Sequence, residues 1–326
     1  MAERRRRLRR SVRRRLFLVV GSPRLVKPRA IAPGATIGIA APGGPVDPLL
    51  LAGGKKVWEA AGFRVVHRED IVARRDYLAG DDDRRAAELA ELIADPAVDA
   101  IVCARGGYGA PRILDRLDAR KFRAARKPLV GYSDATALLL WQRRCAGLVG
   151  FHGPMLERGS DVDPGAMRTL VAALSGARDP AGRKWKGTSR VRGRATGRLV
   201  GGNLVLVAAS LGTAWEIDTR GAILLIEEVN EPPYKIDRLL QQLRGAGKLA
   251  RLAGIGCGAL VACRDDRYPE PTAEDVIAEI ARALRIPLVT ELPFGHCKDN
   301  RAWPVGARAT IDGARGTLEL LEAGVT

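Results

Sequence analysis

The chain has few of the residues that disulfide frameworks and metal sites require. Its 326 residues include only five cysteines and three histidines, and the cysteines are scattered without a C-x-x-C pair. An odd, scattered set of cysteines predicts no disulfide framework, and so few histidines give no zinc ligand set. The sequence therefore indicates reduced thiols in a cytoplasmic protein and no structural metal.

Long apolar runs are also absent from the N-terminal region. The stretch Leu16-Phe17-Leu18-Val19-Val20 is too short for a signal-peptide core or a membrane span. It follows an arginine-rich segment, but this pairing supports twin-arginine export only poorly. We therefore expect no contact with a membrane.

Acidic residues are scarce at the start of the chain, and this explains most of the net charge. The formal charge is +17, of which residues 1–30 supply +11 through 12 Lys and Arg against one acid. This basic segment lacks interleaved aromatic residues and so has no equipment for reading bases. We expect residues 1–32 to be a basic, disordered tail and nucleic acid not to be a partner.

From residue 33 the pattern alternates between strands and helices, which is typical of a parallel sheet covered by helices. Glycine-containing loops follow four of these strands, and ligands bind at this carboxyl edge of such sheets. The expected strands of this first unit are 35–41, 63–66, 100–104, 129–130 and 148–151. The expected helices are 48–61, 81–93, one after Gly109 and one after Ser133.

Residues 161–193 are polar and glycine-rich, which indicates a linker or domain crossing. A second α/β unit follows, so we expect an N-terminal domain at 33–160 and a C-terminal domain at 194–326. The expected strands of the second unit are 195–200, 222–226, 258–262, 287–290, 309–312 and 317–320. Its expected helices are 201–211, one carrying residues 234–243, and 272–284.

Ser133 lies in a segment typical of a nucleophile elbow. An apolar strand ends at Gly131, the serine follows two residues later, and a leucine-rich helix begins at once. The backbone N–H of Asp134 at the helix start could help to hold an oxyanion. The alternative is that Ser133 only caps the helix, which serine often does at this position.

A serine nucleophile needs a base and a carboxylate that orients the base. His67 lies in a charged stretch and is expected at the surface, whereas His152 and His296 both follow strands and are equal candidates. Glu227 and Glu228 come directly after an aliphatic strand, and strand alternation points only one of them inward. The alternative for both acids is a favourable interaction with the dipole of the next helix.

Six segments in order resemble the LD-carboxypeptidase family of serine peptidases, which includes murein tetrapeptide carboxypeptidases and microcin C immunity proteins. The resemblance covers roughly residues 33 to 322. The segments are Arg105-Gly-Gly-Tyr-Gly109, Gly131-Tyr-Ser-Asp134, Phe151-His-Gly-Pro154, Gly201-Gly-Asn-Leu204, Ile226-Glu-Glu-Val-Asn-Glu-Pro-Pro-Tyr-Lys-Ile-Asp-Arg238 and Phe294-Gly-His296.

The resemblance implies a Rossmann-like N-terminal domain and a C-terminal α/β domain with the active site in the cleft between them. It implies Ser133 as nucleophile, Glu227 as orienting acid and His296 as base. The backbone amides of Asp134, Gly106 and Gly107 would form the oxyanion hole. No metal or organic cofactor is needed.

The implied substrate is a peptide with a free C-terminal carboxylate. Murein members of the family cut between the L-centre of diaminopimelate and terminal D-alanine during peptidoglycan recycling. The resemblance also implies a homodimer. The alternatives are an immunity-type hydrolase of peptidyl-nucleotide antibiotics and a non-catalytic α/β ligand-binding protein.

Overall fold

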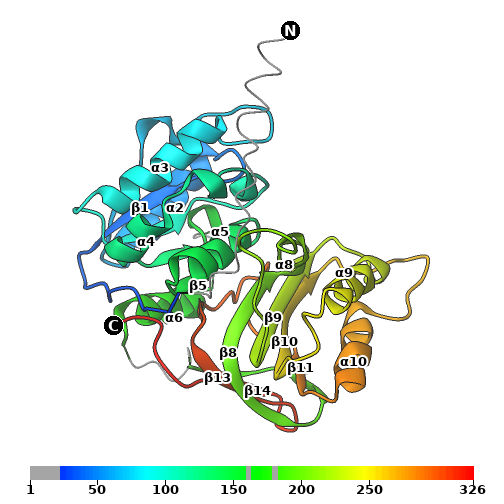
Figure 1. Cartoon of the computed structure of the whole chain (residues 1–326). Coiled ribbons are helices and arrows are strands. Elements are labelled where there is room, and N and C mark those ends of the chain that lie inside the picture. Colours follow the sequence, from blue (N-terminus) through cyan, green and yellow to red (C-terminus); the bar gives the residue numbers. More distant parts are fainter. Residues whose placement is uncertain (1–22, 159–162, 178–182) are drawn as a thin grey trace.

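The computed structural model describes residues 23–158, 163–177 and 183–326, and it confirms the two-domain α/β fold (Figure 1). Most of the expected basic tail, residues 1–22, lies outside the described residues. Residues 23–32 are packed on the first domain, because Val26 forms a bridge with Leu148 and Ile31 is buried.

The first sheet is a parallel sheet with one added antiparallel edge. Its order is β12-β5-β4-β3-β1-β2, and only β12 runs antiparallel to its neighbour. Its strands are β1 (Thr36–Ala40), β2 (Arg64–Val66), β3 (Ala100–Cys103), β4 (Leu129–Gly131), β5 (Gly150–His152) and β12 (Trp303–Val305). The five parallel strands match the sequence prediction. β12 was not predicted, because three residues far along the chain carry no periodic signal.

Helices cover both faces of this sheet. One face packs against α2 (Pro48–Ala60) and α6 (Pro164–Ser175), and the other against α3 (Asp82–Ala94), α4 (Ala119–Ala125) and α5 (Ala135–Trp141). Two 3₁₀ turns at Ala110–Arg112 and Leu114–Arg116 precede α4, where a single helix was expected after Gly109. Pro111 lies in the first of these turns and has no N–H to donate to a helix.

The second sheet has eight strands in the order β6-β14-β13-β8-β9-β10-β11-β7. The central strands β8 to β11 are parallel, and antiparallel strands flank them. The strands are β6 (Lys184–Lys186), β7 (Thr188–Val191), β8 (Arg194–Asn203), β9 (Ala222–Val229), β10 (Gly254–Val261), β11 (Leu288–Thr290), β13 (Arg308–Asp312) and β14 (Thr317–Leu320). Its helices are α8 (Leu204–Ala209), α9 (Pro233–Gly245) and α10 (Ala273–Leu284) (Figure 1).

The stretch 161–193, expected to be a linker, is largely helix and strand in its described part. It forms α6 and the two edge strands β6 and β7 of the second sheet. Edge strands are often short and polar, so their composition resembles that of a loop. Trp185 is the exception in β6, and its side chain is fully buried.

The helix expected from Gly201 starts later, because β8 continues to Asn203. Gly201 and Gly202 have φ values of 130° and 131° within the strand. A Cβ at Gly201 would lie 1.9 Å from the carbonyl oxygen of Leu225. These glycines therefore lie in the strand and do not start the helix. Gly201 allows the backbone of β8 to lie close to that of β9. β10 similarly begins at Gly254, before the expected 258.

Candidate active site

Three loops meet at the carboxyl edge of the first sheet. The amide of Gly44 donates a hydrogen bond to the carbonyl of Gly106 at 2.9 Å. A Cβ at Gly106 would lie 2.9 Å from Ser133 Oγ, so the Gly106 backbone is in direct contact with the serine. The structure thus brings together the loops after β1, β3 and β4, as parallel-sheet topology predicts.

Ser133 has the geometry of a partly exposed turn residue rather than of a helix cap. Its φ is +59°, an uncommon value for a residue with a side chain. A Cβ at Gly131 would approach that of Ala135 to 2.7 Å, which shows how sharply β4 turns into α5. The residue at the N-cap position of α5 is Asp134 and not Ser133. The capping alternative therefore has no support in this geometry.

Asp134 is buried, and its carboxylate fastens the neighbouring loop. Its Oδ2 accepts a hydrogen bond from the amide of Ala110 at 2.7 Å. Burial raises the pKa of this carboxyl to about 6. Across the described ranges, the backbone amides of Asp134, Gly106 and Gly107 donate to no protein acceptor. The three amides are thus free of protein acceptors, and Gly106 is the one whose position is directly next to the serine oxygen.

Glu227 and His296 form a hydrogen-bonded pair from the second domain. His296 Nδ1 donates to Glu227 Oε2 at 2.6 Å, with the glutamate fully buried and the histidine ring partly exposed. This bond occupies Nδ1 and leaves Nε2 as the ring nitrogen available for proton transfer. Gly295 permits the approach, because a Cβ there would lie 2.9 Å from the same carboxylate oxygen.

Glu228 points to the other side of β9 and holds backbone and amide groups together. Its carboxylate accepts bonds from Asn203 Nδ2 at 2.8 Å and from the amide of Val205 at 2.9 Å. Burial raises the pKa of this carboxyl. Strand alternation thus separates the two acids, and Glu227 alone is paired with a histidine.

His152 is brought near the site but is buried in an aromatic cluster. Its ring stacks on Trp303 with centroids 5.1 Å apart and meets the edge of Phe294 at 5.6 Å. Burial, with a smaller contribution from nearby His296, lowers its pKa to about 3. Neither ring nitrogen has a hydrogen-bond partner among the described residues. A neutral ring without an orienting carboxylate does not fit the base. His67, the third histidine, is exposed as expected.

Contacts between the domains bring the serine loop and the Glu227–His296 pair together. Thr136 Oγ1, on the helix that follows Ser133, accepts the amide of Asn203 at 3.1 Å. Asn203 is in register with Glu227 across the β8–β9 ladder. The ring of Tyr132, the residue before Ser133, packs against His296 with centroids 4.8 Å apart.

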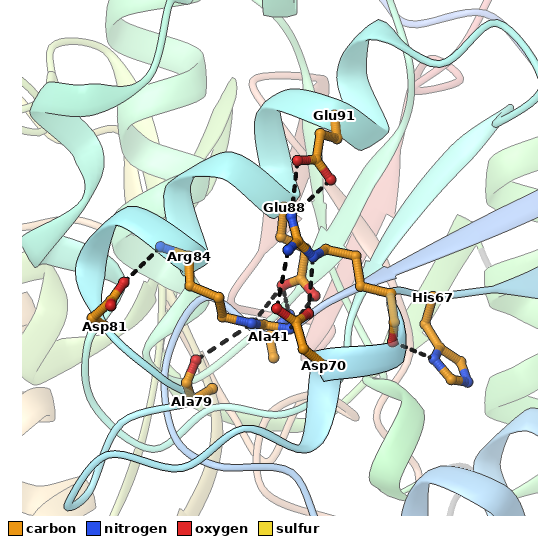
Figure 2. A network of polar contacts seen from close by, with 9 residues as sticks. Ala41, His67, Asp70, Ala79, Asp81, Arg84, Glu88 and Glu91 are labelled. Carbon is orange, nitrogen blue, oxygen red and sulfur yellow. Dashed lines mark hydrogen bonds and ion pairs between the residues drawn. The ribbon is translucent and has the colours of Figure 1, made fainter.

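Buried charges behind the loops were not found by sequence reasoning. Glu88 is fully buried, accepts the amide of Ala41 at 2.6 Å, and is paired with Arg84, which also contacts Asp70 (Figure 2). Arg85, equally buried, donates to the carbonyls of Pro42 and Gly109. Through Ala41 and Pro42, the side chains of Glu88 and Arg85 hold the loop after β1 in place.

A signal for these charges does exist in the sequence. Arg85 and Glu88 share one helical face with the buried Leu89 and Leu92 of α3. A charge on an apolar stripe is costly unless it is paired, so its presence indicates a structural or functional task.

Neither a metal-binding cluster nor a helix suited to a membrane span occurs in the described part of the chain. No group of three or more His, Cys, Asp or Glu side chains there is arranged to hold a metal ion. None of the helices in those residues is long and apolar enough to cross a membrane.

Comparison with known proteins identifies relatives along almost the whole chain. Family models described as the LD-carboxypeptidase N-terminal and C-terminal domains match residues 37–153 and 196–311. A Bacillus subtilis protein named "Probable murein peptide carboxypeptidase" is 37% identical over 305 residues, covering 92% of this chain and 95% of the relative. The murein tetrapeptide carboxypeptidase of Pseudomonas aeruginosa is 34% identical over 256 residues, covering 75% and 82%.

Solved structures agree with this result. The muramoyltetrapeptide carboxypeptidase of Oxalobacter formigenes superposes with a TM-score of 0.78 at 30% identity, covering 88% of this chain and 98% of its own. The microcin C7 self-immunity protein MccF superposes with a TM-score of 0.81 at 23% identity, covering 92% and 100%. The second likeness shows the shared fold alone.

Proposed function

Because the chain belongs to the LD-carboxypeptidase family, we propose that it is a serine carboxypeptidase that removes the C-terminal residue from a peptide at an L,D-bond. The substrate we propose is murein tetrapeptide, which would give tripeptide and D-alanine. The proposal is carried by the hydrogen bond between His296 and Glu227, with His296 packed on Tyr132, the residue before a serine whose φ is +59°.

In the first step the Oγ of Ser133 attacks the scissile carbonyl carbon while His296 Nε2 takes the serine proton. Glu227 holds the imidazole in the tautomer with hydrogen on Nδ1 and stabilises the imidazolium. The developing oxyanion accepts hydrogen bonds from the amides of Asp134 and the Gly106–Gly107 turn. These amides are bound to no other protein group in the described residues.

In the second step His296 returns its proton to the leaving amine, and the C–N bond breaks. The acyl group remains on Ser133, and one amino acid leaves. Water then attacks the ester with His296 as base, and the shortened peptide is released with Ser133 restored. All proton transfers in this sequence use His296, so no metal or cofactor is required by it.

The experiment is incubation of the purified protein with sugar-free murein tetrapeptide, followed by mass spectrometry. We expect loss of one alanine residue, and we expect Ser133→Ala to lower the rate by about 10⁴-fold or more. Intact tetrapeptide with the wild-type protein would contradict the proposed substrate. An aminoacyl sulfamoyl nucleoside, tested in parallel, would then reveal an immunity-type hydrolase. Unchanged cleavage by Ser133→Ala would contradict the mechanism.

A further inference from the structure

The loop that contacts Ser133 begins with an arginine that is fixed in place and partly open to solvent. Arg105 Nη1 donates to the carbonyl of Pro45 at 2.8 Å, and Nε lies 3.4 Å from Glu157 Oε2. The arginine side chain is 39% exposed, whereas that of Glu157 is 6% exposed. Among the described residues Nη2 donates to no protein acceptor. The guanidinium is therefore oriented and retains free donors.

This guanidinium lies beside the proposed oxyanion hole. A Cβ at Gly44 would lie 3.7 Å from Arg105 Nε and 3.2 Å from the carbonyl oxygen of Gly106. Gly106 in turn contacts the Ser133 hydroxyl. One glycine position thus touches both the arginine head and the turn next to the nucleophile.

Removal of a single terminal residue places the substrate's carboxylate close to the scissile bond. When a single residue is removed, its carboxylate carbon is three bonds from the scissile carbonyl carbon, within about 4 Å. A cation that recognises that carboxylate must therefore lie next to the nucleophile and the oxyanion hole. Arginine is suited to this task, since its planar fork donates two parallel hydrogen bonds to a carboxylate.

Other cations near these loops fit less well. Arg85 is fully buried, and its two terminal nitrogens already bind Pro42, Gly109 and Asp82. Lys298, two residues beyond His296, is exposed, and no ion pair fixes it within the described chain. It provides a matched comparison, because it is an exposed cation close to His296 in the sequence.

We propose that Arg105 binds the C-terminal carboxylate of the substrate and restricts the enzyme to removal of a single terminal residue. The proposal rests on the carboxypeptidase function stated above. Glu157 is a positioning residue. It is buried, accepts a hydrogen bond from the amide of Asp47 at 2.8 Å, and forms the ion pair that orients the arginine.

The test compares two substrates on each enzyme preparation: the tetrapeptide with a free carboxylate and the same peptide ending in D-alaninamide. The wild-type enzyme should prefer the free acid. Arg105→Gln should raise KM for the acid by about 10- to 100-fold, leave kcat much less changed, and remove the preference. Arg105→Lys should keep part of the preference for the free acid. Glu157→Gln should weaken the preference without abolishing it.

The ratio of the two rates does not depend on the fraction of correctly folded enzyme, so partial misfolding of a variant cannot imitate the result. Lys298→Gln is the control and should keep the wild-type ratio. An equal loss on both substrates in Arg105→Gln, or loss of the preference in Lys298→Gln, would overturn the role of Arg105 and leave the carboxypeptidase function intact. If the wild-type enzyme cleaves neither peptide, both proposals fail.

Discussion

At the scale of single residues, Glu227 and Glu228 show how strand alternation separates two neighbouring identical side chains. Both follow the same aliphatic run and both are buried, yet one is bonded to His296 and the other to Asn203 and Val205. Their expected roles therefore differ. Glu227 acts on the chemistry through the histidine, and Glu228 holds the turn between β8 and α8.

Glu227→Gln should lower kcat by about 10²- to 10⁴-fold, because a neutral amide does not stabilise the imidazolium and can favour the wrong tautomer. Substrate binding should change much less. The matched variant Glu228→Gln should retain most of the activity and lose thermal stability, since a buried acceptor of three bonds is altered. Steady-state kinetics and melting curves measure both effects, and equal kcat losses would show that the assignment is wrong.

At the same scale, the sequence predicted the catalytic candidates better than the residues that support them. Ser133 and His296 lie in loops that follow strands, and Glu227 lies near the end of the aliphatic strand β9. His152 was an equal candidate from the residues alone, because a sequence cannot show that a ring is enclosed by Trp303 and Phe294. Arg85, Glu88 and Glu157 were missed, because their tasks depend on backbone groups of distant loops.

At the scale of elements, α2 contains two adjacent glycines in opposite environments. A Cβ at Gly53 would meet no atom within 4 Å, whereas one at Gly54 would lie 2.0 Å from the carbonyl oxygen of Leu156. Gly54 allows the helix to approach the 3₁₀ turn Leu156–Arg158 closely. Gly53 has no such task and only weakens the helix.

Gly53→Ala should therefore stabilise the protein by about 0.5–1 kcal/mol, since alanine loses less backbone entropy in a helix. Gly54→Ala should destabilise it by about 1–3 kcal/mol, because the methyl group collides with fixed backbone. Urea unfolding of both variants measures the change in unfolding free energy and its sign for each substitution. Stabilisation by both substitutions would mean that α2 does not pack on Leu156 as described.

Elements with strong periodicity were predicted well, and short edge elements were not. The central strands β1, β3, β4 and β9 and the helices α3 and α10 agree with the sequence pattern to within a few residues. Strands β6, β7 and β12 are three or four residues long and are defined by their pairing partners. Such strands depend on tertiary contacts, which a local pattern does not contain.

At the scale of the whole molecule, the two domains share structure. One continuous hydrophobic core includes Leu139 of α5, Val207 of α8 and Leu224 of β9, and β12 returns from the second domain to the first sheet. The serine and the Glu227–His296 pair therefore belong to one packed unit. The homodimer and the cytoplasmic location implied by the family resemblance stay predictions.

His152, at the centre of this shared structure, should make the protein sensitive to acid. Its pKa is lowered to about 3 by burial, so below its ordinary value near 6.5 the unfolded chain binds a proton that the folded chain does not. Above about pH 6.5 this histidine does not change the free energy of unfolding. As the pH falls toward 3, the free energy of unfolding decreases. By pH 5 the loss is about 2 kcal/mol.

His152→Phe should remove this loss, since the ring is enclosed by aromatic side chains and bonds to none of the described residues. The decrease in unfolding free energy between pH 7 and pH 5 should be smaller in the variant by about 2 kcal/mol. Asp134, whose pKa is raised to about 6, has the opposite dependence, but it is present in both proteins and cancels. An identical pH dependence in the two proteins would contradict the prediction.

The central claim is that Ser133 becomes acylated by the substrate, and the covalent intermediate tests it most directly. Wild-type enzyme is mixed with murein tetrapeptide, quenched in acid within milliseconds to seconds, digested with trypsin and examined by mass spectrometry. The tryptic peptide 127–143 contains Ser133 and no cysteine, so a cysteine adduct cannot be confused with it. We expect this peptide to gain the mass of the tripeptide acyl group, with fragmentation placing it on Ser133. Turnover without any adduct there, or an adduct on another residue, would contradict the mechanism.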